Sequence, residues 1–133
     1  MASAPLRICR VLIVDDNHDS ADTLGMLLGF FGHEVRIVYD GGACLDAVAA
    51  FRPDAILLDL DMPGMSGFEA ANRLRQSPGE FGSPLLVALT GRTGDDRDRR
   101  IAKTIGFDYY LIKPATSEQL RRVVSASLDR KEG

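Results

Sequence analysis

The sequence predicts an α/β fold: one doubly wound, five-stranded parallel sheet with helices on both faces. Two observations lead to this prediction. Short apolar runs alternate with amphipathic segments along the chain of 133 residues, and four of the five runs are nearly continuous in hydrophobic residues. Continuous apolar runs are typical of parallel strands that helices cover on both sides. Regular alternation of strands and helices favours right-handed crossovers within a single sheet.

The strands of this sheet are predicted from the apolar runs, taken in chain order. They are expected at Ile8–Val14, Val35–Tyr39, Ala55–Leu58, Leu85–Leu89 and Tyr109–Ile112. Each run has a length typical of a strand and is too short to be one of the helices that separate the runs.

The helices are predicted from apolar residues that recur at helical spacing. They are expected at Ala21–Phe31, Gly42–Phe51, Gly67–Arg75, Asp96–Ile105 and Ser117–Leu128. Gly32 and Gly106 can end the first and fourth helices in the left-handed conformation. Thr116 or Ser117 can cap the last helix. The segment Ser77–Pro84 is rich in Gly and Pro and is predicted to be a loop.

Length, composition and charge limit the functional classes. The length fits one domain, and 45% hydrophobic with 26% charged residues is ordinary for a soluble protein. A net charge of −3 gives no electrostatic case for direct binding to nucleic acid or to an anionic membrane. No signal peptide or membrane-spanning run is visible, so a cytoplasmic location is expected. Cys9 and Cys44 lie in apolar stretches, which favours two buried thiols over a disulfide.

Polar residues stand at the ends of four of the predicted strands. Asp15 and Asp16 follow the first strand, Asp59 ends the third, Thr90 ends the fourth and Lys113 ends the fifth. Each residue alone is ordinary in a turn, a strand or an exposed position. In a doubly wound sheet, however, ligands bind beyond the carboxyl ends of the strands. We therefore expect these five side chains to converge at one edge of the sheet.

The residue types in this set suit phosphoryl chemistry. Neighbouring carboxylates repel one another unless a cation joins them. Carboxylate oxygens with open positions suit Mg²⁺, whose coordination is completed by water and a substrate phosphate. Lys113 and Thr90 can bind phosphoryl oxygens, and a carboxylate can act as the nucleophile, giving an aspartyl phosphate. The set therefore predicts a site that holds Mg²⁺ and a phosphoryl group.

Four stretches together resemble the receiver domain of two-component response regulators, in both order and spacing. They are Val11–Asn17, Pro53–Gly67, Ala88–Gly91 and Tyr110–Pro114. The resemblance spans Ile8 to Leu128 and implies the flavodoxin-like (βα)5 fold with strand order 2-1-3-4-5. We expect a receiver domain at residues 7–130, a disordered lead-in at 1–6 and a tail at 131–133.

The resemblance implies a phosphoacceptor of a bacterial two-component phosphorelay rather than a turnover enzyme. Asp59 would accept a phosphoryl group from a phosphohistidine of a sensor histidine kinase or phosphotransfer protein. The domain would catalyse its own phosphorylation and dephosphorylation. Mg²⁺ would be bound by the side chains of Asp16 and Asp59, by the backbone carbonyl of Asp61, and by Asp15 through a water molecule.

The resemblance also implies a switch. Lys113 would contact the phosphoryl group, Thr90 would close on it and Tyr110 would turn inward behind Thr90. The Lys113–Pro114 bond is cis in the family. The responding surface would comprise the fourth helix, fifth strand and fifth helix, and would bind a downstream effector. A transient homodimer is compatible with this family.

Two residues near the acceptor are less usual. Asp61 adds a carboxylate two residues after Asp59, and Arg92 stands two residues after Thr90. One hypothesis is that Asp61 and Arg92 pair across the mouth of the site and affect the access of hydrolytic water. The alternative is two independent, solvated side chains, since an exposed ion pair contributes little.

Three other functional classes share individual features with this sequence. Asp59-Leu60-Asp61 matches the nucleophile motif of haloacid-dehalogenase-type phosphatases, but Met62-Pro63 replaces the usual small residue, and the acidic pair comes first in the chain. A flavodoxin-type flavin module needs a Ser/Thr/Gly phosphate loop where this chain has the acidic Asp15–Asp19. An interaction module that has lost phosphorylation is disfavoured because all five site residues are present.

Overall fold

The computed structural model describes residues 7–91 and 95–132. They form a parallel sheet of five strands in the order β2-β1-β3-β4-β5, which confirms the predicted fold class and strand order. The strands are β1 (Arg10–Val14), β2 (Glu34–Val38), β3 (Ala55–Asp59), β4 (Leu85–Thr90) and β5 (Tyr109–Ile112). The helices are α1 (His18–Phe30), α2 (Gly41–Phe51), α3 (Gly67–Gln76), α4 (Pro78–Phe81), α5 (Asp96–Ile105) and α6 (Ser117–Glu132).

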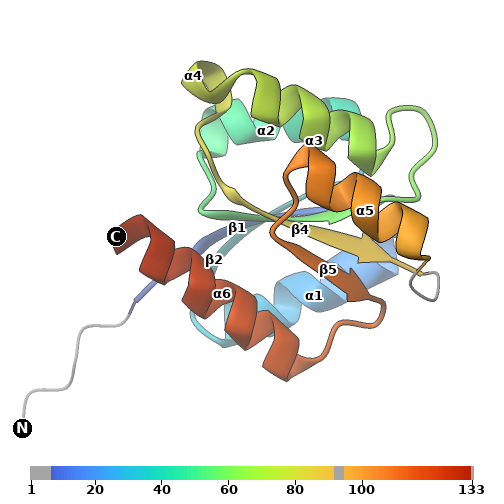
Figure 1. Ribbon diagram of the computed structural model, residues 1–133. Coiled ribbons are helices and arrows are strands. Elements are labelled where there is room, and N and C mark those ends of the chain that lie inside the picture. Colours follow the sequence, from blue (N-terminus) through green and yellow to red (C-terminus); the bar gives the residue numbers. More distant parts are fainter. Residues whose placement is uncertain (1–6, 92–94, 133) are drawn as a thin grey trace, which may run out of the picture.

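The helices form a layer on each side of the sheet. Figure 1 shows α1 and α6 on one face, with α2, α3, α4 and α5 on the other. Two hydrophobic cores result. Leu12, Phe51 and Leu74 belong to the core under α2 and α3, whereas Ile13, Leu28 and Leu120 belong to the core under α1 and α6. Residues that alternate along β1 therefore enter different cores, which explains why this strand is continuously apolar from Val11 to Val14.

The predicted helix and strand positions are confirmed, with shifts at some ends. β1 begins at Arg10 rather than Ile8, whose side chain is exposed. α1 begins at His18, three residues earlier than predicted, because the Asn17 side chain caps it by accepting from the Ser20 N–H. α6 continues to Glu132 and so runs through part of the predicted tail. The predicted lead-in at 1–6 lies outside the described residues.

The prediction of a plain loop at Ser77–Pro84 was wrong, because the short helix α4 lies within it. Pro78 occupies the start of this helix, where its fixed φ suits a helix and its missing N–H has no partner to lose. Phe81 is buried in the core under α2 and α3, which holds the turn in place. Because α4 is additional, the helices predicted as fourth and fifth are α5 and α6.

Several local predictions are confirmed. Gly32 and Gly106 follow α1 and α5 with positive φ values of 95° and 118°. Thr116 caps α6: its hydroxyl accepts from the Gln119 N–H, while the Gln119 side chain accepts from the Thr116 N–H. Cys9 and Cys44 are both buried and are not joined in a disulfide. Among the described residues, no helix has the length and apolar character needed to cross a membrane.

Candidate functional site

The register of the sheet brings the polar strand ends together. Val14 pairs with Leu58 across β1 and β3, so Asp15 and Asp59 follow at adjacent positions. Asp59 pairs with Leu89, the residue before Thr90. Thr90 pairs with Ile112, the residue before Lys113. All five predicted strand-end residues therefore reach the same edge of the sheet, as the sequence predicted.

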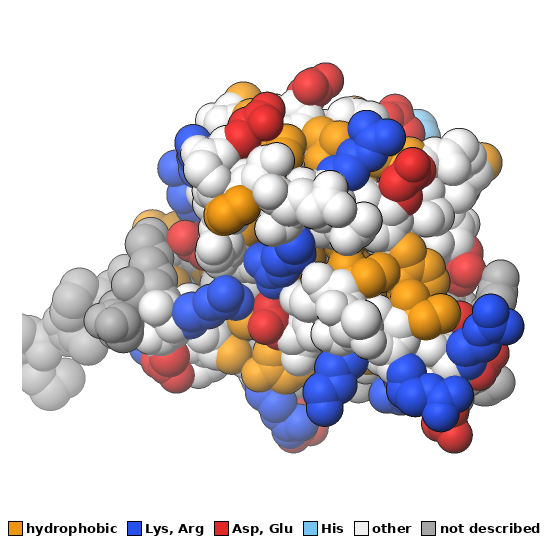
Figure 2. Space-filling model, turned by 45° about the horizontal axis from the view of Figure 1, so that its top comes forward, with side chains coloured by type: hydrophobic (Ala, Val, Ile, Leu, Met, Phe, Trp, Pro, Cys, Tyr) orange, Lys and Arg blue, Asp and Glu red, His pale blue; other side chains and the backbone are white. Residues whose placement is uncertain are grey.

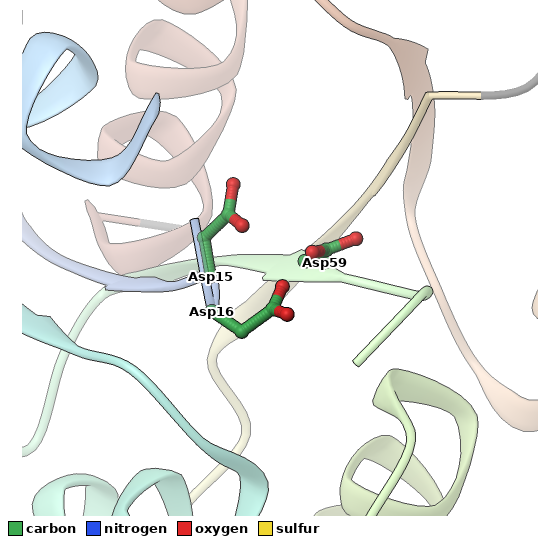
Figure 3. Close-up of side chains that lie close together, drawn as sticks. All are labelled: Asp15, Asp16 and Asp59. Carbon is green, nitrogen blue, oxygen red and sulfur yellow. The ribbon is translucent and has the colours of Figure 1, made fainter. Parts of the chain in front are cut away.

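Three of these residues form an acidic cluster. Asp15, Asp16 and Asp59 each offer a carboxylate oxygen, and the three oxygens lie within 4.8 Å of one another. Figure 3 shows their side chains gathered where β1 and β3 end. Asp15 and Asp59 are buried, whereas Asp16 is exposed. Hard oxygen donors at this spacing, with one side open to solvent, fit a divalent cation such as Mg²⁺.

Lys113 neutralises part of this negative charge. Its Nζ lies 2.8 Å from Asp15 Oδ2 and 3.4 Å from Asp59 Oδ2. Burial alone would lower the pKa of Lys113, but the two carboxylates outweigh it and raise that pKa. For Asp15, burial acts to raise the pKa, yet Lys113 and the Asn17 N–H lower it overall. Asp15 and Lys113 therefore form an ionised pair. The Lys113–Pro114 bond is cis, as the resemblance implied.

The pKa of Asp59 is raised, whereas that of Asp15 is lowered. Burial raises the pKa of its carboxyl to about 6, and the proximity of Asp15 acts in the same direction. The Asp61 N–H, which donates to Asp59 Oδ1 at 2.9 Å, partly opposes this effect. Near neutral pH the carboxyl is still mostly ionised, so it can act as a nucleophile.

Thr90 and Asp61 meet at the other side of the acceptor. The Thr90 hydroxyl is buried and donates to Asp61 Oδ2 at 3.3 Å. Asp61 itself is exposed. The predicted partner of Asp61 was Arg92, which lies outside the described residues. Sequence reasoning missed the contact between Thr90 and Asp61, although the position of Asp61 beside the acceptor had marked it as unusual.

Tyr110 lies behind Thr90. Its hydroxyl is buried and finds no hydrogen-bond partner of good geometry among the described residues. Burial raises the pKa of this phenol, nearby carboxylates act in the same direction, and the closeness of Thr90 opposes them. On the outer side, the Arg99 guanidinium stacks 4.5 Å from the ring centroid. The hydroxyl is thus already buried in this structure.

Gly67 is a site residue that sequence reasoning did not identify. It begins α3, and a Cβ atom added to it would collide with the backbone carbonyl oxygen of Asp59 and would lie 2.9 Å from Leu60 Cα. Only glycine permits this close approach of α3 to the end of β3. The signal available in the sequence was a glycine at the start of a helix. That this glycine lies against Asp59, about 8 residues earlier in the chain, is decided by the tertiary fold.

The helical face beside the site carries mixed charge. Figure 2, which is turned toward α2, α3 and α5, shows Lys and Arg side chains lying beside acidic and hydrophobic ones. Basic residues are frequent on α5, where Arg97, Arg99 and Arg100 are all exposed. Asp96 and Asp98 stand between them on the same helix. The surface therefore presents charges of both signs.

The comparisons with known proteins agree with this geometry. The chain is 38% identical over 122 residues to the response regulator MprA of Mycobacterium avium, a match that covers 91% of the chain and 51% of that protein. The chain thus spans about half the length of the curated relatives it matches. Among solved structures, it is similar to a CheY-like response regulator receiver domain protein from Methanospirillum hungatei, with a TM-score of 0.81, 28% identity, and coverage of 96% and 100%.

A second solved structure is the receiver domain of the histidine kinase CKI1 from Arabidopsis thaliana, determined in complex with Mg²⁺. The TM-score is 0.79 at 27% identity, covering 89% of this chain and 90% of that one. The family model described as "Response regulator receiver domain" matches residues 11–125. This match contains β2 to β5, all of β1 except Arg10, and every strand-end residue of the site. The chain therefore belongs to the family of response regulator receiver domains of two-component systems.

Proposed function

We propose that this domain accepts a phosphoryl group on Asp59 from the phosphohistidine of a sensor histidine kinase or phosphotransfer protein. The observation that carries the proposal is the convergence of three carboxylates and Lys113 at one edge of the sheet. Asp59 lies beside Asp15 and Asp16, and Lys113 contacts both Asp15 and Asp59, so an attacking oxygen and a balancing cation are already in place. Positioning and charge neutralisation are the main requirements of phosphoryl transfer.

In the proposed transfer, a carboxylate oxygen of Asp59 forms a bond to phosphorus as the bond between phosphorus and the histidine nitrogen breaks. The nitrogen leaves with its electron pair. No proton has to be removed from Asp59, because its pKa of about 6 leaves it mostly ionised near neutral pH. Lys113, now 3.4 Å from Asp59, would bind a phosphoryl oxygen and stabilise the added charge. Hydrolysis of the acyl phosphate would return the domain to its starting state.

A bound Mg²⁺ would supply the positive charge that lets the acidic cluster and a phosphoryl group coexist. Asp16 and Asp59 would hold it through side chains, Asp61 through its backbone carbonyl and Asp15 through a water molecule. The donor set supports this assignment because three clustered carboxylates carry more negative charge than Lys113, which contacts two of them, can balance. The CKI1 receiver domain, solved with Mg²⁺, is a related case.

The proposed output is a change at α5, β5 and α6, the elements that the sequence predicted as the responding surface. Thr90 would turn to the phosphoryl group, and Tyr110 would respond behind it. A downstream effector or a second copy of the domain would bind this surface. The donor protein would approach beside α1, where a groove of about 370 Å³ lined by Thr23, Leu27 and Pro114 adjoins Lys113. A cytoplasmic location fits this role.

The phosphatase alternative receives no support from the fold or from the comparisons. The acidic pair follows the first strand of this sheet, and the family match runs over nearly the whole chain. We expect one phosphoryl group per chain rather than continuing turnover of a phosphate ester.

The test is phosphorylation by acetyl phosphate with Mg²⁺, followed by intact-mass measurement. Wild type should gain one phosphoryl group, and Asp59→Asn should gain none. Asp54→Asn is a matched control, because Asp54 lies at the opposite end of β3 and accepts from the Arg10 N–H. Labelling that persists in Asp59→Asn, or labelling without Mg²⁺, would contradict the proposal.

A further inference from the structure

Thr90 and Asp61 form a contact that has consequences for the switch. The Thr90 hydroxyl, 1% exposed, donates to the carboxylate of Asp61 across 3.3 Å. These residues are 29 positions apart in the sequence. Asp61 is itself tied to the acceptor, because its backbone N–H donates to Asp59 Oδ1 at 2.9 Å. The acceptor, Asp61 and Thr90 therefore form one connected chain of hydrogen bonds.

The Thr90 hydroxyl has a single proton. A hydroxyl group donates one hydrogen bond at a time. If Thr90 is to donate to a phosphoryl oxygen on Asp59, it has to release the Asp61 carboxylate first. The two acceptors therefore compete for the same donor, and the structure shows the state in which Asp61 holds it.

Charge adds to this competition. Once Thr90 has turned to the phosphoryl group, the Asp61 carboxylate has lost a hydrogen-bond donor. The phosphoryl group also adds negative charge at Asp59, next to Asp61. Like charges at a partly buried site disfavour each other. Both the lost hydrogen bond and the added repulsion favour the unphosphorylated arrangement.

The burial of Tyr110 indicates that Thr90 is the group that moves. The Tyr110 hydroxyl is already buried, and Arg99 stacks over the outer face of its ring. Burial of Tyr110 therefore does not require the phosphoryl group. What distinguishes the two states at this position is the acceptor to which the Thr90 hydroxyl donates.

We propose that Asp61 is a positioning residue that holds Thr90 in the unphosphorylated orientation and so sets how readily the domain switches. This inference rests on the proposed phosphoacceptor function and assigns Asp61 a role beyond its backbone carbonyl. Asp61 acts through Thr90, and the strength of this one contact opposes the phosphorylated conformation.

The test measures how tightly the domain binds beryllofluoride, a stand-in for the phosphoryl group, at saturating Mg²⁺. Binding is followed by ¹⁹F NMR and by the amide signals of residues near Thr90. Asp61→Ala should bind beryllofluoride on the order of 10-fold more tightly than wild type, the factor expected for a hydrogen bond to a charged acceptor. Asp61→Asn keeps a neutral acceptor for Thr90 and should lie between the two. Glu69→Gln removes an exposed charge paired with Arg73 and should match wild type.

A double-mutant cycle separates the contact from charge alone. In Thr90→Val, which lacks the hydroxyl, Asp61→Ala should change beryllofluoride binding much less than in wild type. The effects of mutations at distant, independent sites add to within about a factor of 2 in affinity. The coupling between Asp61→Ala and Thr90→Val must therefore be larger than about a factor of 2. Equal effects of Asp61→Ala in both backgrounds would overturn the inference. The Mg²⁺ midpoint of each variant, measured without beryllofluoride, confirms that the metal is saturating.

The two proposals fail in different ways. If wild type neither binds beryllofluoride nor gains a phosphoryl group from acetyl phosphate, the phosphoacceptor function fails. If wild type does both and Asp61→Ala binds beryllofluoride as wild type does, only the role of Asp61 fails.

Discussion

At the scale of the residue, Asp59 illustrates how burial changes a common side chain. It ends an apolar strand and is 2% exposed. Its pKa rises from 3.8 to about 6, chiefly because burial disfavours the charged form. The same carboxyl must nevertheless ionise to act as a nucleophile. Function at this position is therefore expected to reduce the stability of the free domain.

The pH dependence of stability tests this expectation. Because the folded-state pKa of Asp59 is raised, the folded state binds more protons than the unfolded state between pH 3.8 and about 6. Stability from this group is present below that window and is lost as pH rises through it. At pH 7 the loss should reach up to about 3 kcal/mol. Asp59→Asn should recover most of it, as measured by urea unfolding with a chelator present.

Two comparisons make the Asp59 result specific. The gain in Asp59→Asn should disappear near the lower end of the window, where the wild-type carboxyl is protonated in both states. Asp46→Asn, an exposed change on α2, should leave stability nearly unchanged. An Asp59→Asn variant no more stable than wild type at pH 7 would show that the carboxyl is not destabilising.

At the scale of the element, the start of α3 fixes the geometry of the acceptor. Ser66 caps the helix by accepting from the Glu69 N–H. The next residue, Gly67, lies against the backbone that ends β3. The helix thus supports the strand end from which Asp59 projects, and the absence of a side chain is what allows this contact.

Gly67→Ala should both destabilise the domain and slow the labelling of Asp59. The added Cβ meets backbone at Asp59 and Leu60, which cannot move aside as a flexible side chain could. Overpacking of this kind lowers stability by about 1–3 kcal/mol. Gly29→Ala is the control in α1, since its Cβ would meet nothing within 4 Å. Thermal unfolding and the rate of acetyl phosphate labelling are the measurements; equal behaviour of the two variants would contradict the role of Gly67.

At the scale of the whole molecule, one carboxylate far from the site joins several elements. Asp108 directly precedes β5 and so lies at the amino ends of the strands, whereas Asp59 lies at their carboxyl ends. Its Oδ2 accepts from the Leu86 N–H at 2.9 Å, from Arg75 at 3.2 Å and from Arg130 at 3.3 Å. Arg75 also donates to the backbone carbonyls of Gly106 and Pro84. The network links β4 to α3 and α6.

Asp108→Ala should therefore destabilise the domain without preventing its phosphorylation. The variant leaves the buried Leu86 N–H without its acceptor and removes the carboxylate that pairs with the half-buried Arg75. We expect a loss of about 2–3 kcal/mol in the free energy of unfolding. Asp129→Ala breaks only an exposed pair with Arg7 and should lose less than about 1 kcal/mol. Urea unfolding measures both, and equal losses would contradict the proposed importance of the network.

The sequence by itself determined the fold class, all five strands and the strand-end residues Asp15, Asp16, Asp59, Thr90 and Lys113. It could do so because apolar periodicity is a local property, and because parallel strands carry their carboxyl ends to one edge. It missed α4, where burial of Phe81 outweighed the Gly and Pro signals of a loop.

Only the tertiary structure decided which side chains touch. The contact of Thr90 with Asp61, the packing of Gly67 on the end of β3 and the Asp108 network join residues from different elements. The raised pKa of Asp59 likewise depends on burial and on Asp15, which lies far away in the sequence. These properties depend on distances of a few ångströms between remote segments, and such distances follow from packing rather than from any local pattern.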